Sequence, residues 1–144
     1  IKVFLYSVTS DIKHLVQALV KKFPTRVRYS TTRRKLSSEQ MYQLFSRSRI
    51  FIGASKADGI STSFLEALCL GSYPLQTNTS CAIEWVNKGF KASILPADSA
   101  AFLESFLISN NSNFLEQARL QNLELAKDLL SFQKISNDSR KFYA

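Results

Sequence analysis

The chain has 144 residues, is 45% hydrophobic and carries a formal net charge of +8 at pH 7. This length and apolar content are ordinary for one globular domain with its own core, and no internal repeat or low-complexity tract is visible. The longest apolar runs are far shorter than the ~18–20 residues of a membrane span, and no signal-peptide pattern is visible, so we exclude a transmembrane helix from this sequence.

Strand-like and helix-like segments alternate along the chain. Residues 2–8 are predicted to form the first strand, because their apolar side chains run together as in a sheet covered on both faces. A helix is predicted at 11–22, with Thr9 or Ser10 as its cap and an apolar stripe along one side. The stripe consists of Ile12, Leu15, Val16 and Leu19. The further strands are predicted at 26–29, 49–54, 73–77 and 92–95, and the further helices at 38–46, 62–70, 81–87, 99–108, 114–130 and 132–143.

This order predicts an α/β fold, with a Rossmann-like parallel sheet and helices on both faces. Residues 49–54 are expected to form the most central strand, and Gly71 is expected to end the helix at 62–70. Ligands of such sheets bind beyond the C-terminal ends of the strands. The loop 55–61 leaves such a strand end, so we expect the binding site there.

The segment 58–66 carries the residues best suited to bind a ligand. It begins a predicted helix, where unpaired amides and the helix dipole favour an anion, and Ser61 is the expected N-cap. Asp58 and Glu66 flank this anion site, and each carboxylate can accept hydrogen bonds from neutral hydroxyl groups. A ligand in the order polyol, phosphate, polyol describes a sugar nucleotide. The candidate binding residues are Asp58, Gly59, Ile60, Ser61, Thr62, Ser63 and Glu66.

At this segment the sequence resembles a known family. Asp58 and Glu66, followed by a short helix and Gly71, are similar to the E-x7-E motif of GT-B fold glycosyltransferases, close to the large retaining family 4. Three further segments are similar to family segments in the same order and at the same spacing, at 36–45, 83–89 and 92–98. The sequence departs from the motif at Asp58, where Glu is usual, so a side chain one methylene shorter takes this position.

The resemblance implies that residues 1–144 are a single Rossmann-like donor-binding domain, the C-terminal half of a GT-B fold. The only Met is Met41, and the chain opens at Ile1 inside a strand-like run. We therefore expect a fragment of a two-domain enzyme whose N-terminal acceptor domain is missing. The implied activity is transfer of a sugar from a nucleotide-diphosphate sugar to an acceptor, with retention. Residues 1–144 are expected to be inactive alone.

The resemblance also implies a role for each motif residue. Glu66 accepts the ribose hydroxyls of the nucleotide, and Asp58 contacts hydroxyls of the transferred sugar. Residues 59–63 hold the phosphate and the sugar, and the leaving phosphate is stabilised by helix-end amides and basic residues. The family's Gly-Arg…Lys-Gly segment, which grips the diphosphate, has no match in this sequence. No metal and no cofactor is expected, because GT-B enzymes generally need no divalent metal and the nucleotide sugar is a substrate.

These residues also have structural interpretations. Ser63 and Glu66 fit the capping box S-x-x-E. Asp58 fits an Asx-turn, and Gly59 fits a backbone conformation or a close approach that a Cβ would block. Glu84 matches a family position, but we interpret it as a surface or structural acid. The alternative function is a non-catalytic α/β domain that binds a phosphorylated ligand or an anionic partner at the same helix N-terminus.

The basic residues are concentrated at the beginning of the chain. Residues 1–50 carry eleven Lys or Arg and two Asp or Glu, which is +9, whereas residues 51–144 carry eight and nine, which is −1. One interpretation is a solvated face that meets the missing domain. Another is adhesion to anionic lipid, which suits a peripheral membrane enzyme with a lipid-linked acceptor. The basic run 33–35 is short and has no interleaved aromatic residue, so we expect no nucleic-acid partner.

Three other residues are candidates for chemistry. Cys69 and Cys81 have neither metal-site spacing nor a CxxC pattern, which indicates reduced packing residues in a cytoplasmic protein, with the inner face of a membrane as the alternative location. His14 falls on the first predicted helix, away from the motif. We therefore expect His14 at a helix surface rather than as a catalytic base.

Overall fold

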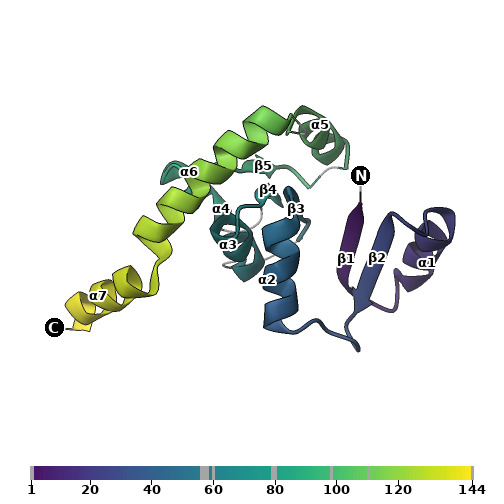
Figure 1. Ribbon diagram of the computed structural model, residues 1–144, viewed down its shortest axis with the longest axis horizontal. Helices are drawn as coiled ribbons and strands as arrows, with labels where there is room; N and C mark the ends of the chain where they lie inside the picture. The colour runs from purple at the N-terminus through teal and green to yellow at the C-terminus, as the bar shows by residue number, and fades with distance from the viewer. Residues whose placement is uncertain are drawn as a thin grey trace. The chain divides into compact units, whose positions relative to one another are not determined.

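The computed structural model describes residues 2–55, 59, 61–78, 81–97, 99–109 and 111–143 of the chain (Figure 1). The chain forms two compact units, an N-terminal unit of Ile1–Met41 and a C-terminal unit of Tyr42–Ala144. Among the helices of the described ranges, none combines the length and the hydropathy that crossing a bilayer requires.

The N-terminal unit is built from two strands and the helix between them. β1 (Val3–Val8) and β2 (Val27–Thr31) pair in parallel, and α1 (Lys13–Lys22) packs on β2. Of the predicted apolar stripe of α1, Val16 is buried, while the other three members are exposed. A two-stranded sheet covers only a narrow strip of a helix, which explains why the stripe is not buried as a whole.

The beginning of α1 differs from the prediction. Neither Thr9 nor Ser10 caps the helix, because its N-cap residue is Ile12, whose side chain accepts no capping bond. The Thr9 hydroxyl instead hydrogen-bonds the Asp11 carboxylate, and this bond lowers the pKa of Asp11. The predicted cap was wrong because a neighbouring carboxylate competes with the helix for the same hydroxyl.

The C-terminal unit contains a three-stranded parallel sheet. Its strands are β3 (Ile50–Gly53), β4 (Tyr73–Thr77) and β5 (Ser93–Leu95), in the order β3-β4-β5. All five residues of β4 are buried, so β4 is the central strand of this sheet and the expectation for 49–54 was wrong. The predicted α/β order with parallel strands is confirmed, and the described strands lie in two sheets.

The helices follow the predicted order, with their ends within two residues of the predicted ones. Besides α1 they are α2 (Ser38–Arg47), α3 (Thr62–Cys69), α4 (Ala82–Asn87), α5 (Ser99–Ser109), α6 (Ser112–Leu130) and α7 (Phe132–Tyr143). α3 follows β3 and precedes β4 in the chain and packs against both strands (Figure 1).

Helices cover both faces of the three-stranded sheet. On one face, β4 packs against α5 and α6. The residues of this core are Tyr73, Leu75, Leu115 and Ala118, with Phe102 and Phe106 packed against them. On the opposite face, Phe51 of β3 meets Phe45 of α2 with ring centroids 5.6 Å apart. Phe51 is the register partner of Pro74. Pro74 lies between Tyr73 and Leu75 in β4, so its side chain points to the opposite face of the sheet from theirs.

α3 ends as its sequence predicts. Gly71 has φ 83, which favours glycine, and it follows the C-cap residue Leu70. The N–H of Ser72 donates to Ala67 O at 2.9 Å, and the N–H of Gly71 donates to Leu68 O at 3.3 Å. These two bonds form a Schellman motif, which satisfies the last carbonyl groups of α3 and turns the chain into β4.

Candidate functional site

The start of α3 consists of the N-cap residue Ser61 and the first two helical residues, Thr62 and Ser63. As predicted, Ser61 is the N-cap, with extended φ and ψ, and its Oγ accepts a hydrogen bond from Phe64 N at 3.3 Å. Phe64 N also donates to Ser61 O at 3.1 Å. Within the described part of the chain, the N–H groups of Thr62 and Ser63 have no acceptor. A helix start with two unpaired N–H groups can bind an anion.

Glu66 presents a free carboxylate one turn further along α3. Its side chain is half-buried, and among the described residues none donates a hydrogen bond to it. Thr62 lies four residues earlier and therefore on the same side of the helix. The opposite side of α3 is buried through Phe64, Ala67 and Leu68. Thr62 and Glu66 thus lie one turn apart on the side of α3 that the core does not use.

The capping-box interpretation of Ser63 and Glu66 is wrong. The N-cap is Ser61, so Ser63 is the second residue of the helix and Phe64 occupies the third position. A capping box needs its Glu at that third position, where the carboxylate reaches back to the N-cap. Glu66 lies two residues too late for this role.

Two candidate residues, Asp58 and Ile60, lie outside the described residues. Gly59 lies between them and is exposed. Its φ is not in the left-handed region, and no described atom lies within 4 Å of the place where a Cβ would stand. No described residue therefore requires glycine at this position, and a close approach of the ligand to Gly59 stays a prediction. The Gly59 carbonyl accepts a hydrogen bond from Cys81 N at 3.3 Å, which joins this residue to the beginning of α4.

Sequence reasoning missed two polar residues at the end of β4. Thr77 donates its hydroxyl to Ser55 O at 2.7 Å and so ties the end of β4 to the segment that leaves β3. Gln76 is completely buried, and neither atom of its amide has a hydrogen-bond partner among the described residues. The available signal was a glutamine near the C-terminal end of an otherwise apolar strand, at the edge where ligands of parallel sheets bind.

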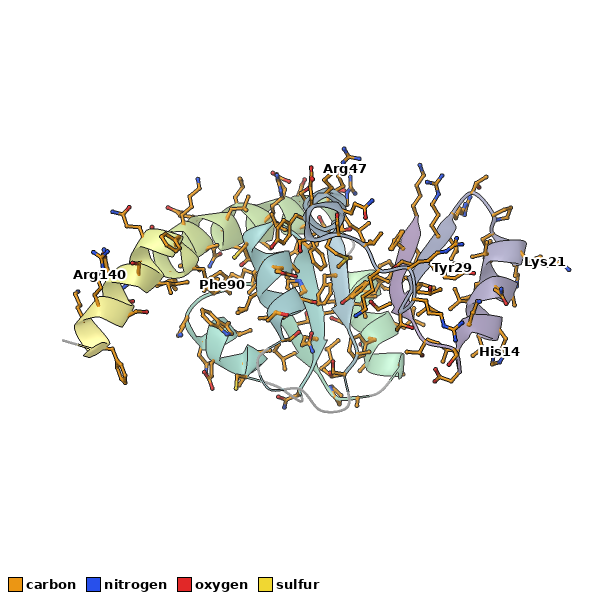
Figure 2. The ribbon with its side chains drawn as sticks, turned by 90° about the horizontal axis from the view of Figure 1, so that it is seen from below. His14, Lys21, Tyr29, Arg47, Phe90 and Arg140 are labelled. Carbon is orange, nitrogen blue, oxygen red and sulfur yellow. The ribbon has the colours of Figure 1, made fainter. Side chains whose placement is uncertain are left out.

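The remaining titratable candidates lie elsewhere. His14 projects from the exposed surface of α1, as expected (Figure 2), and Glu84 is exposed on α4. Burial and the neighbouring Glu66 carboxylate raise the pKa of the Cys69 thiol, and Glu84 raises the pKa of Cys81. A raised pKa makes a thiol a poorer nucleophile. The described residues contain no group of three or more His, Cys, Asp or Glu that could hold a metal ion.

No family model and no curated protein matches the sequence. Solved structures do match it over nearly its whole length. A sucrose-phosphate synthase (tll1590) from Thermosynechococcus elongatus has a TM-score of 0.74 at 13% identity, with 97% of this chain and 37% of that chain covered. HepE (Alr3699) from Anabaena, solved in complex with UDP-glucose, has a TM-score of 0.72 at 12% identity, with 99% and 40% covered.

A glycosyltransferase from Rickettsia africae ESF-5 has a TM-score of 0.71 at 15% identity, with 98% of this chain and 39% of that chain covered. The chain therefore has the fold of one part of GT-B glycosyltransferases and spans 37–40% of the length of these three proteins. At these identities the similarity establishes the fold and not the activity.

Proposed function

We propose that this chain is the nucleotide-sugar-binding half of a glycosyltransferase, which transfers a sugar from a nucleotide-diphosphate sugar to an acceptor with retention. The start of α3 carries this proposal: two unpaired amides, at Thr62 and Ser63, are followed by the free carboxylate of Glu66 on the same side of the helix. Phosphate requires such donors, and the cis-diol of a ribose requires such an acceptor.

Each residue has a stated role in the proposal. The amides of Thr62 and Ser63 bind the diphosphate and stabilise the charge that develops on it as the sugar leaves, in a front-face displacement. Glu66 accepts the two ribose hydroxyls, and Asp58 contacts the transferred sugar. The acceptor is bound by an N-terminal domain of the same protein, which the family resemblance implies.

The donor role predicts that nucleotides stabilise the protein. We expect at least one of UDP, GDP and ADP, each at millimolar concentration, to raise the Tm of residues 1–144. A ligand at 100 times its Kd stabilises a protein by ~2.7 kcal/mol, which a thermal-shift assay detects easily. UDP is the first choice, because HepE was solved with UDP-glucose. A well-folded protein that responds to none of the three contradicts the nucleotide assignment.

Pyrophosphate and uridine are the controls for this assay. If both the ribose and the phosphate are bound, UDP raises the Tm more than either control does at the same concentration. The alternative function, a non-catalytic domain that binds an anionic partner at the same helix end, predicts that pyrophosphate is as effective as UDP. The response to the controls therefore decides between the two functions.

A further expected result concerns activity. Purified residues 1–144 transfer no sugar from UDP-glucose, GDP-mannose or ADP-glucose, because the motif supplies donor contacts and no acceptor site. The measurement is release of the nucleoside diphosphate in the presence of a panel of sugar and lipid acceptors. Transfer above the level of a heat-inactivated sample contradicts the assignment of this chain to the donor half.

A further inference from the structure

Two amide side chains of the described residues are completely buried in the C-terminal unit, and they differ in one respect. Asn122 on α6 is satisfied by a single backbone residue, since its Oδ1 accepts from Lys91 N at 2.7 Å and its Nδ2 donates to Lys91 O at 2.9 Å. Gln76 on β4 is equally buried, but within the described part of the chain neither its Oε1 nor its Nε2 has a partner. A buried amide without partners destabilises a protein, so its presence requires an explanation.

The backbone around Gln76 is shaped to hold its amide. Gln76 is the register partner of Gly53, the last residue of β3. A Cβ on Gly53 would overlap the Gln76 Oε1 and lie 2.9 Å from its Cδ, so the amide occupies the room that any other residue at 53 would fill. The glycine and the glutamine therefore form a matched pair across the two strands.

This pair lies at the edge of the sheet that leads to the start of α3. Gly53 is the last residue of β3, and the next residue of β4, Thr77, holds Ser55 through the bond at 2.7 Å. The Gln76 amide thus lies one residue inside the C-terminal edge, next to the backbone of Gly53, where β3 ends. The described backbone directly beyond Gly53 is that of Ala54, one residue further along the chain.

We propose that Gln76 is a positioning residue of the donor site: when the nucleotide binds, its amide forms hydrogen bonds with the peptide groups of Ala54, the residue after Gly53, and so holds the end of β3 from which the chain continues to α3. The proposal rests on the proposed function. An amide suits this task because it offers a donor and an acceptor together and matches a peptide group without adding charge. The free energy of nucleotide binding then offsets the cost of burying an amide that has no partner in the free protein.

Gln76→Met is the decisive variant, because methionine is similar in length and volume but has no amide. We expect the free variant to have a higher Tm than the wild type, since the unpaired amide is removed. We also expect the Kd of the variant for the nucleotide that stabilises the wild type to be higher by roughly tenfold, as for the loss of one or two neutral hydrogen bonds. A structural defect without a binding role moves the Tm and leaves the Kd unchanged.

Asn122→Leu is the matched control, because it removes a buried amide whose partners are already present in the free protein. We expect a lower Tm and an unchanged Kd, the opposite pattern to Gln76→Met. Gln76→Leu, with circular dichroism as the test of folding, serves as a second variant. If both Gln76 variants fold with a Tm below that of the wild type, or if neither variant folds, the amide is satisfied in the free protein and the proposal is overturned.

Equal nucleotide affinity of the wild type and Gln76→Met also overturns the proposal, and it leaves the donor role of the domain in place. A wild type that responds to none of UDP, GDP and ADP contradicts the proposed function itself, and the role of Gln76 with it. The two failures are therefore distinguished by the wild-type measurement alone.

Discussion

Glu66→Gln is expected to weaken binding of both the free nucleotide and the sugar nucleotide by roughly ten- to a hundredfold. The carboxylate accepts both hydroxyls of the ribose, and charge-assisted bonds of this kind contribute ~1.5–3 kcal/mol. Gln keeps the shape of the side chain but removes its charge. Because the capping box is excluded by the position of Ser61, the substitution leaves the start of α3 intact. Isothermal titration calorimetry measures the two affinities directly.

Glu84→Gln is the matched control for this experiment. Glu84 is an exposed acid in the first turn of α4, and it resembles a family position without lying on α3. We expect its nucleotide affinity to equal that of the wild type. Asp58→Asn is expected to leave free nucleotide binding unchanged and, in the full-length enzyme, to lower turnover. Equal nucleotide affinity of the wild type and Glu66→Gln contradicts the ribose role.

Asn122→Leu is expected to lower the free energy of unfolding by ~1–3 kcal/mol. The substitution removes both bonds between the Asn122 amide and the backbone of Lys91, which join α6 to the segment before β5. Leucine fills the space but leaves the N–H and C=O of Lys91 without these partners. The midpoint of urea unfolding, at unchanged m-value, measures the loss.

The neighbouring residue Gln121 supplies the control for this prediction. Its Nε2 donates to Gly89 O at 2.9 Å, which is the same kind of bond to the backbone, but the side chain is exposed. Water replaces this bond when the amide is removed, so Gln121→Leu is expected to change stability by less than about 0.5 kcal/mol. A comparable loss in both variants contradicts the claim that burial makes the Asn122 bonds important.

Local patterns predicted most of the elements and the start of the candidate site. Ser61 was recognised as an N-cap and Gly71 as a helix end because capping bonds join residues that lie within five positions of one another. Strand 73–77 was recognised because a buried strand is continuously apolar apart from its end. Such signals are complete within a short window of sequence, so they needed no knowledge of the fold.

Other features depended on contacts between distant residues. The Asn122 and Lys91 backbone bonds join residues 31 positions apart, and the room for the Gln76 amide is made by Gly53 on another strand. The sequence does not show which strand is central, which side of α1 is covered, or which of two buried amides has partners. These properties follow from how the elements pack, because burial and pairing depend on neighbours in space. The chemistry at the start of α3 could thus be predicted from residues 58–66, whereas the unpaired amide of Gln76 became visible only once β3 and β4 were placed side by side.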